Sequence, residues 1–234
     1  MISLIISESA LELVPFELED HPSVVSHARK LGKHSSEILL DNSWHFAAMK
    51  GIRNEIKRGR PDLVHFSILE ATTIPLYLKN KLNLFVHTVD DKVIHFGKNV
   101  HLPKSYHRFQ GVIEKLYRER KILSNNELLL EIKDQTFSEL MDELNPSKVI
   151  GFSTEGQLSS YEKIGQKSLK ILVLYLVDFK KVIFLTLSKI KLLICTLLVM
   201  NLLKAMLSHL ESFMSTKKPF LCRKFDFFFI AVIV

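Results

Sequence analysis

Cysteine is nearly absent from the sequence, since Cys195 and Cys222 are the only two among 234 residues. Two thiols cannot form a framework of several disulfides, and they cannot supply all the ligands of a cysteine-based zinc site. The ten histidines are scattered and form no His-Glu-x-x-His motif or comparable ligand spacing. We therefore expect neither a disulfide-stabilised fold nor a metal cofactor.

Glycine is absent after Gly165, and residues 167–234 contain one proline, Pro219. Acidic residues are also scarce there, while Leu, Ile, Lys, Phe and Ser dominate. A domain of this length without glycine would have to build its turns without the residue that best tolerates a positive φ. We therefore divide the chain into an α/β region at residues 1–165 and an atypical apolar, basic tail at residues 166–234.

Three interpretations of the tail remain open. Residues 192–207 are almost all apolar and could enter a membrane, but Asn201 and Lys204 interrupt a run that is already short for a span. The tail could instead form amphipathic helices that pack on the first region. It could also be the out-of-frame translation of AT-rich DNA, whose codons favour Lys, Leu, Ile and Phe.

Charge and composition limit the class of protein. Hydrophobic residues make up 47% and charged residues 24% of the chain, as in ordinary globular proteins. The formal net charge of +7 favours a polyanionic partner such as nucleic acid or an acidic membrane surface. Residues 1–15 lack a basic segment before an apolar run, so they do not resemble a signal peptide, and we expect a cytoplasmic protein.

The hydrophobic pattern predicts an α/β fold in the first region. Short apolar or alternating runs predict strands at residues 2–6, 63–69, 84–89, 92–96, 128–132 and 149–152. Helical spacing and capping residues predict helices at residues 23–31, 44–52, 105–120 and 137–144. Asp90-Asp91 could be a catalytic carboxylate pair, but a hairpin turn between two of the strands explains these residues better.

Basic residues gather at two places in this region. Arg60 and Asp62 flank a rigid proline, and such a short pair can orient a guanidinium toward a phosphate or a base edge. Lys104 and Arg108 lie four residues apart at the start of a predicted helix, where phosphates bind well. Each feature alone could be an ordinary solvated surface, but together they favour RNA binding. In that helix Tyr106 could stack on a base, whereas Phe109 fits the apolar core better.

Several separate motifs together resemble the SPOUT-class methyltransferases, of the archaeal type, that modify N1 of a pseudouridine in small-subunit rRNA during ribosome biogenesis. They lie at residues 9–15, 39–41, 58–69, 84–92 and 101–111. The resemblance covers residues 1 to about 165. It implies a SPOUT-like α/β-knot fold, S-adenosylmethionine as methyl donor, a homodimer, and small-subunit rRNA and ribosome assembly intermediates as partners.

The resemblance also assigns site residues. Arg60 corresponds to an arginine that contacts the substrate rRNA, and Asp62 to the acid that orients it. His101, Lys104 and Arg108 stand where the family has three basic RNA contacts, and two of them here are not arginine. The loop at residues 151–156 follows a predicted strand, so Phe152, Ser153 and Thr154 are candidate cofactor contacts. No catalytic proton acceptor can be assigned from the sequence.

The tail departs from the family pattern. The family carries a glycine-rich loop and a later Pro-Leu segment, which complete the knot around the methyl donor, and the tail contains neither. We therefore expect an incomplete knot. A one-base shift between about Gln166 and Leu176 permits codons for both segments, so the tail could be a frameshift product. The alternatives to an active enzyme are an rRNA-binding assembly factor without a donor pocket and, less favoured, a membrane-anchored protein.

Overall fold

The computed structural model describes residues 2–98, 100–147, 149–160, 172–176 and 228–233. Their centre is an eight-stranded sheet with the order β4-β5-β3-β2-β1-β7-β6-β8. The four strands β2, β1, β7 and β6 run parallel, and the remaining neighbours pair antiparallel. The strands are β1 (Ile2–Ser9), β2 (Leu82–Thr88), β3 (Lys92–Phe96), β4 (Lys121–Ser124), β5 (Glu127–Asp134), β6 (Val149–Ser160), β7 (Leu172–Leu176) and β8 (Phe228–Ile233).

Strand β1 lies at the middle of the parallel strands because it is apolar on both faces. Leu4 and Ile6 join the larger core on one face, whereas Ile5 points into a second cluster on the other face. All three side chains are at most 3% exposed. A strand buried on both faces is typical of a parallel sheet covered by helices.

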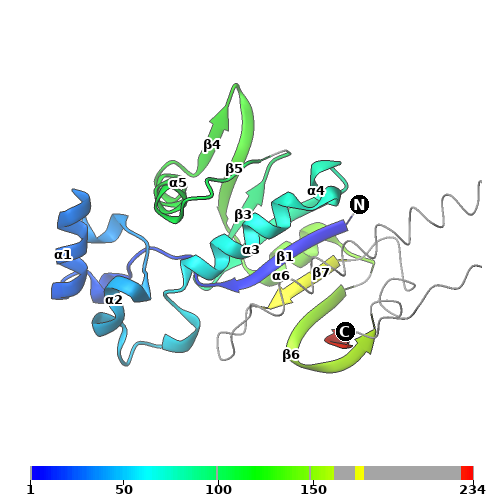
Figure 1. The fold of residues 1–234 in the computed structure, drawn as a ribbon, viewed down its shortest axis with the longest axis horizontal. Coiled ribbons are helices and arrows are strands. Elements are labelled where there is room, and N and C mark those ends of the chain that lie inside the picture. Colours follow the sequence, from blue (N-terminus) through cyan, green and yellow to red (C-terminus); the bar gives the residue numbers. More distant parts are fainter. Residues whose placement is uncertain (1, 99, 148, 161–171, 177–227, 234) are drawn as a thin grey trace, which may run out of the picture.

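Helices cover both faces of the sheet (Figure 1). Helices α3 (Pro61–Thr73), α4 (Pro75–Leu78) and α5 (Tyr106–Glu119) pack on the larger core, and α6 (Phe137–Leu144) packs on the opposite face. Phe109, Ile113 and Leu116 of α5 are fully buried, at the helical spacing expected from the sequence. The described part is therefore a three-layer α/β structure.

A small helical unit follows β1 and has its own apolar cluster. It contains α1 (Pro22–Leu31), α2 (Asn42–Met49) and the short 3-10 helices η1 (Phe16–Leu18), η2 (Ser35–Glu37) and η3 (Glu55–Lys57). Val24 and Ala28 of α1 pack there with Ala48 and Met49 of α2. Figure 1 shows this unit beyond the carboxyl end of β1. It leads the chain back to the start of α3.

The predicted strand at residues 63–69 is wrong, because this segment lies inside α3. Val64, Ile68, Ala71 and Thr72 are buried, at the three- and four-residue spacing of a helix. Pro61 occupies the first turn, where its missing N–H costs no hydrogen bond. Residues 63–69 alone are too few to distinguish the two-residue period of a strand from the 3.6-residue period of a helix, and the buried Ala71 and Thr72 lie beyond them.

Most other predicted elements are confirmed. Helix α1 ends at Gly32, which has φ of 65°, and the strands β2 and β3 form the expected hairpin. Helix α6 has the predicted bounds. The sequence did not predict α4 or β4.

The structure describes only two short segments of the tail, residues 172–176 and 228–233. Strands β7 and β8 are described, whereas residues 192–207, the proposed frameshift window up to residue 171 and the expected incomplete knot lie outside the described residues. In the part that the structure describes, none of the helices is both long and apolar enough to cross a membrane.

Candidate RNA-binding surface and sheet-edge cleft

Arg60 and Asp62 form an exposed ion pair at the start of α3. The guanidinium donates from Nε to Oδ1 of Asp62 at 2.9 Å and from Nη2 to Oδ2 at 2.8 Å. The side chains are 41% and 48% exposed, and the hydrogen bonds to Asp62 raise the pKa of Arg60 further. The remaining N–H groups of Arg60 are free to bind a second anion while Asp62 fixes the plane of the guanidinium.

Arg58, two residues earlier, makes a similar pair in a buried place. It donates from Nε and Nη2 to the two carboxylate oxygens of Glu12 at 2.8 and 2.7 Å. The Arg58 and Glu12 side chains are only 14% and 6% exposed. Burial raises the pKa of Glu12 and the pairing opposes that rise, while the hydrogen bonds to Glu12 raise the pKa of Arg58. Because each carboxylate oxygen accepts one hydrogen bond from the guanidinium, the pairing favours the charged forms of both groups.

Gly59 separates the two arginines and has φ of 69°. A Cβ atom there would lie 2.5 Å from Cε of Met49, and the Gly59 carbonyl accepts a hydrogen bond from the Asn42 backbone at 2.8 Å. Other residues rarely adopt this φ. The close packing and the turn allow one arginine to face inward and the next to face solvent.

His65 connects α3 to the loop before α5. Its Nε2 lies 2.8 Å from the Pro103 carbonyl oxygen, and a carbonyl can only accept, so this nitrogen carries the hydrogen. The ring stacks on Phe109 with centroids 4.3 Å apart, and burial lowers the pKa of His65. A neutral, buried histidine therefore holds the loop that carries Lys104.

Asp41 joins the small helical unit to α5. One of its oxygens caps α2 by accepting from the Ser43 backbone at 2.8 Å. The other accepts from the Tyr106 hydroxyl at 2.5 Å and from Nε2 of Gln110 at 3.3 Å. Burial, followed by the Asp41 charge, raises the pKa of Tyr106, so the hydroxyl stays protonated and donates. Asp41 also acts electrostatically on Arg60, which places the exposed pair near the first turn of α5.

The predicted basic contacts lie at this same end of α5. His101, Lys104 and Arg108 are exposed, and none of them forms an ion pair with another described residue. Phe109 is fully buried, as the core interpretation predicted, and Tyr106 is half-buried with its hydroxyl engaged. Arg58, by contrast, is held by Glu12 and is not available to RNA.

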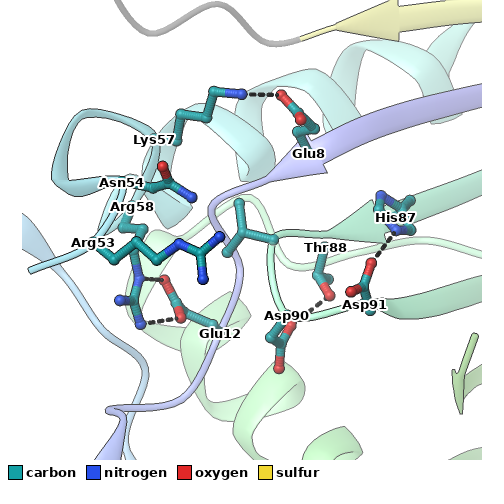
Figure 2. Close-up of a pocket in the computed structure, with 11 residues that line it drawn as sticks. Glu8, Glu12, Arg53, Asn54, Lys57, Arg58, His87, Thr88, Asp90 and Asp91 are labelled. Carbon is teal, nitrogen blue, oxygen red and sulfur yellow. Dashed lines mark hydrogen bonds and ion pairs between the residues drawn. The ribbon is translucent and has the colours of Figure 1, made fainter. Parts of the chain in front are cut away.

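A cleft of about 430 Å³ opens where β1 and β2 end (Figure 2). Its lining mixes both signs of charge, and neighbours of opposite sign pair across it, as in the 2.7 Å contact from Nζ of Lys57 to Glu8. Glu8 has φ of 49°, an uncommon value for a residue with a side chain, and such strain is often found at functional sites. The lining residues are Glu8, Glu12, Arg53, Asn54, Lys57, Arg58, His87, Thr88, Val89, Asp90 and Asp91.

Asp90 and Asp91 form the turn between β2 and β3, which confirms the hairpin interpretation. Asp90 accepts from the Thr88 hydroxyl at 2.5 Å and from Nζ of Lys92 at 2.5 Å. Asp91 lies 3.3 Å from Nε2 of His87, and Nδ1 of His87 is buried without a hydrogen-bond partner among the described residues. Both carboxylates thus have structural partners, and Asp91 is the more exposed of the two.

The candidate cofactor residues Phe152, Ser153 and Thr154 lie inside β6 rather than in a loop. Strand β6 pairs with β7 only as far as Phe152 and then continues beside β8, with a register shift between Phe152 and Gln157. Antiparallel pairing with β8 therefore extends the strand beyond the length predicted from the sequence. Residues 153 and 154 still follow the last parallel pair, at the sheet edge where β1 and β2 end.

In the described ranges, no group of three or more His, Cys, Asp or Glu side chains could hold a metal ion. Sequence reasoning also passed over His65 and Glu12 as organisers of this region. His65 lies on the buried face of a segment that was taken for a strand. Glu12 pairs with a residue 46 positions away, a separation that no local pattern reveals.

Comparison with known proteins gives a consistent result. The sequence pattern of the EMG1/NEP1 methyltransferase family matches residues 4–211. The chain is 39% identical over 167 residues to the ribosomal RNA small subunit methyltransferase Nep1 of Thermococcus sibiricus, a match that covers 71% of this chain and 76% of that protein. It is 40% identical over 164 residues to the Nep1 of Staphylothermus marinus, which covers 70% of this chain and 71% of that protein.

A solved structure is similar over most of the fold. The crystal structure of Archaeoglobus fulgidus Nep1 bound to S-adenosylhomocysteine matches with a TM-score of 0.70 and 27% sequence identity. The match covers 82% of this chain and 95% of that one. The three-layer α/β arrangement described above is therefore shared with a protein that binds the product of methyl transfer.

Proposed function

The chain belongs to the EMG1/NEP1 methyltransferase family, and from this membership we propose that it transfers a methyl group from S-adenosylmethionine to small-subunit rRNA. The observation that carries the proposal is the similarity to a Nep1 structure that holds S-adenosylhomocysteine. That molecule is what remains of S-adenosylmethionine after its methyl group has left. The fold is accordingly the SPOUT-like α/β fold that the resemblance implied.

The finer proposal is that the target is N1 of a pseudouridine. The N1–H bond breaks, the new bond forms between N1 and the methyl carbon, and the bond from that carbon to sulfur breaks. The sulfonium becomes a neutral thioether and one proton is released. Such an in-line displacement depends mainly on the position of the nitrogen relative to the methyl group.

The described residues are compatible with a donor at the sheet edge. Four parallel strands end there, and ligands of α/β folds bind beyond the carboxyl ends of such strands. When bound, S-adenosylmethionine would supply an electrophilic methyl group. Phe152, Ser153 and Thr154 are the proposed contacts, since Phe152 makes the last parallel pair of β6 with β7 and the other two follow it.

The RNA would be held by the surface around the first turn of α5. Arg60 would contact the substrate, with Asp62 fixing its guanidinium, and His101, Lys104 and Arg108 would contact the RNA beside it. The exposure of His101, Lys104 and Arg108 and the 41% exposed, doubly hydrogen-bonded side chain of Arg60 support this role. We also propose a cytoplasmic homodimer that acts on ribosome assembly intermediates.

The test is to incubate the full chain with radiolabelled S-adenosylmethionine and unmodified small-subunit rRNA, and then to identify the labelled nucleoside by chromatography and mass spectrometry. The proposal predicts label in a methylated pseudouridine. Label in another nucleoside would support the methyltransferase activity but refute pseudouridine as its target. Absence of label in an rRNA that the protein binds would refute the proposed methyltransferase activity.

A second candidate function is an rRNA-binding assembly factor that transfers no methyl group. It is favoured by the absence of glycine after Gly165, because the donor loop expected from the resemblance is glycine-rich. Calorimetric titration with S-adenosylhomocysteine separates the two candidates. Sequencing the DNA between the codons of Tyr161 and Phe184 tests the frameshift proposal, and codons incompatible with the two missing segments would refute it.

A further inference from the structure

Helix α2 presents two exposed aromatic side chains with a cation beside each. Trp44 is 44% exposed, and Nζ of Lys30 lies 5.2 Å from the centre of its ring. Phe46 is 57% exposed, and Nζ of Lys50 lies 5.5 Å from its ring centre. Singly exposed apolar side chains are common at protein surfaces, so the feature that distinguishes these two rings is the cation beside each of them.

A histidine on helix α1 holds the Trp44 ring in place. Its ring stacks on His27 with the centroids 4.5 Å apart and the planes 10° from parallel. Nδ1 of His27 lies 3.0 Å from Nε2 of His45, and Nδ1 of His45 accepts from the Asp41 backbone at 3.1 Å. Nε2 of His45 therefore carries the hydrogen and donates to His27. Burial lowers the pKa of both histidines, so the support is neutral and the indole is fixed before any ligand binds.

The same network continues into the proposed RNA surface. The backbone of Asp41 orients His45, and the Asp41 carboxylate binds Tyr106 on α5. The support of the Trp44 ring and the first turn of α5 are therefore attached to one junction at Asp41.

Resting on the proposed function, we propose that Trp44, with Lys30 beside it, is a stacking site for an unpaired base of the rRNA. Every nucleobase has a π face that can stack on an indole, and a lysine next to the ring attracts the phosphate of the same nucleotide. Proteins that bind single-stranded nucleic acid combine aromatic rings and cations in this way. The cation beside each ring favours RNA over a second copy of this basic chain as the occupant.

Trp44 is the only tryptophan in the chain, so its fluorescence reports on this site alone. The protein is titrated with a short single-stranded oligouridylate, with an RNA duplex of the same length, and with unmodified small-subunit rRNA. Stacking predicts quenching by the single strand and by the rRNA, and little change with the duplex. Emission that depends on protein concentration without RNA would instead place a second copy of the chain on this surface and overturn the inference.

Variants make the test quantitative. Loss of a stacked base typically weakens binding by about 5- to 150-fold, so Trp44→Leu should lose affinity for single-stranded RNA within that range, while Trp44→Phe should keep most of it. Phe16→Leu is the matched control, because Phe16 is 89% exposed and has no cation over its ring among the described residues. Circular dichroism melting establishes that each variant is folded.

The outcomes separate this inference from the proposed function. If Trp44→Leu binds rRNA as tightly as the native chain, the stacking site is refuted while rRNA binding stands. If the native chain does not bind small-subunit rRNA, the proposed function fails and the inference falls with it. Lost affinity in Trp44→Leu, with affinity retained in Trp44→Phe and Phe16→Leu, supports the stacking site.

Discussion

Two arginine–carboxylate pairs lie on either side of Gly59 and differ mainly in their surroundings. Arg58 with Glu12 and Arg60 with Asp62 each form two hydrogen bonds of 2.7–2.9 Å with the same guanidinium nitrogens. The first pair spans 46 positions and is nearly buried, whereas the second spans two and is exposed. The geometry of an ion pair therefore does not show what its arginine does. Burial and sequence separation decide whether the arginine stabilises the fold or remains available to a ligand.

The largest difference between the pairs should appear in stability. Glu12→Ala removes both hydrogen bonds of the nearly buried Arg58 guanidinium and leaves only Glu17, whose Oε1 lies 3.8 Å from Nη1, so the free energy of unfolding should fall by roughly 3 kcal/mol. The matched variant Asp62→Ala breaks an exposed pair and should cost at most about 1 kcal/mol. Urea denaturation measures both values. Equal losses would show that the buried position of Glu12 has no special effect.

Lowering the pH should reduce the free energy of unfolding through the buried His45 of helix α2. Burial lowers the His45 pKa from 6.5 to about 4, so the folded state binds fewer protons than the unfolded state between these values. The resulting stabilisation is present above pH 6.5 and is lost as the pH falls toward 4. At 1.36 kcal/mol per pKa unit it amounts to roughly 3 kcal/mol.

Urea midpoints measured across that pH range test this linkage. His45→Gln has a side chain that cannot titrate, so its stability should depend less on pH over the same interval. An identical pH dependence in the native chain and the variant would assign the effect to other groups.

The exposed pair should matter for RNA rather than for folding. Arg60→Ala should weaken binding to small-subunit rRNA by roughly 1–3 kcal/mol, and its effect on the free energy of unfolding should stay below about 1 kcal/mol. Arg118→Ala is the control, since Arg118 is 64% exposed on the last turn of α5. Filter-binding titrations that give the two variants the same affinity would remove Arg60 from the proposed contact set.

The smallest effect concerns the salt dependence of RNA binding. In a Lys30→Ala background, which removes the phosphate contact inferred beside Trp44, and with Arg58 held by Glu12, the Lys and Arg side chains proposed for phosphates are Arg60, Lys104 and Arg108. Three such contacts to single-stranded RNA predict a slope of log affinity against log salt of roughly −2. If Arg58 were a fourth phosphate contact, the slope would be roughly −3. A measured slope nearer −3 would return Arg58 to the RNA surface.

Local signals in the sequence were sufficient for much of the fold. Helix α6 has the predicted bounds, and the structure shows that they are set locally, since Thr136 and Glu139 form a capping box and Asn145 ends the helix with a positive φ. The apolar face of α5 was likewise predicted from Phe109, Ile113 and Leu116. In both helices the information lies within a few residues of the element that it defines.

The features that the sequence did not predict depend on contacts between residues far apart in the chain. The pattern of residues 63–69 does not reveal helix α3, because its burial by α5 and the sheet is a tertiary effect that a seven-residue window does not show. The extension of β6 depends on β8, which lies far along the chain. Arg60, Lys104 and Arg108 could be proposed as site residues from sequence, but the commitment of Arg58 to Glu12 could not, because its partner is distant in the sequence.

The measurement that tests the account most directly is methyl transfer from labelled S-adenosylmethionine to small-subunit rRNA, run side by side with the native chain and Arg60→Ala. We predict that the native chain labels the rRNA and that Arg60→Ala, at an rRNA concentration well below saturation, labels it about tenfold less, while their free energies of unfolding differ by less than about 1 kcal/mol. Equal labelling by both proteins would contradict the role of the exposed pair. No labelling by a native chain that binds the rRNA would contradict the enzyme itself.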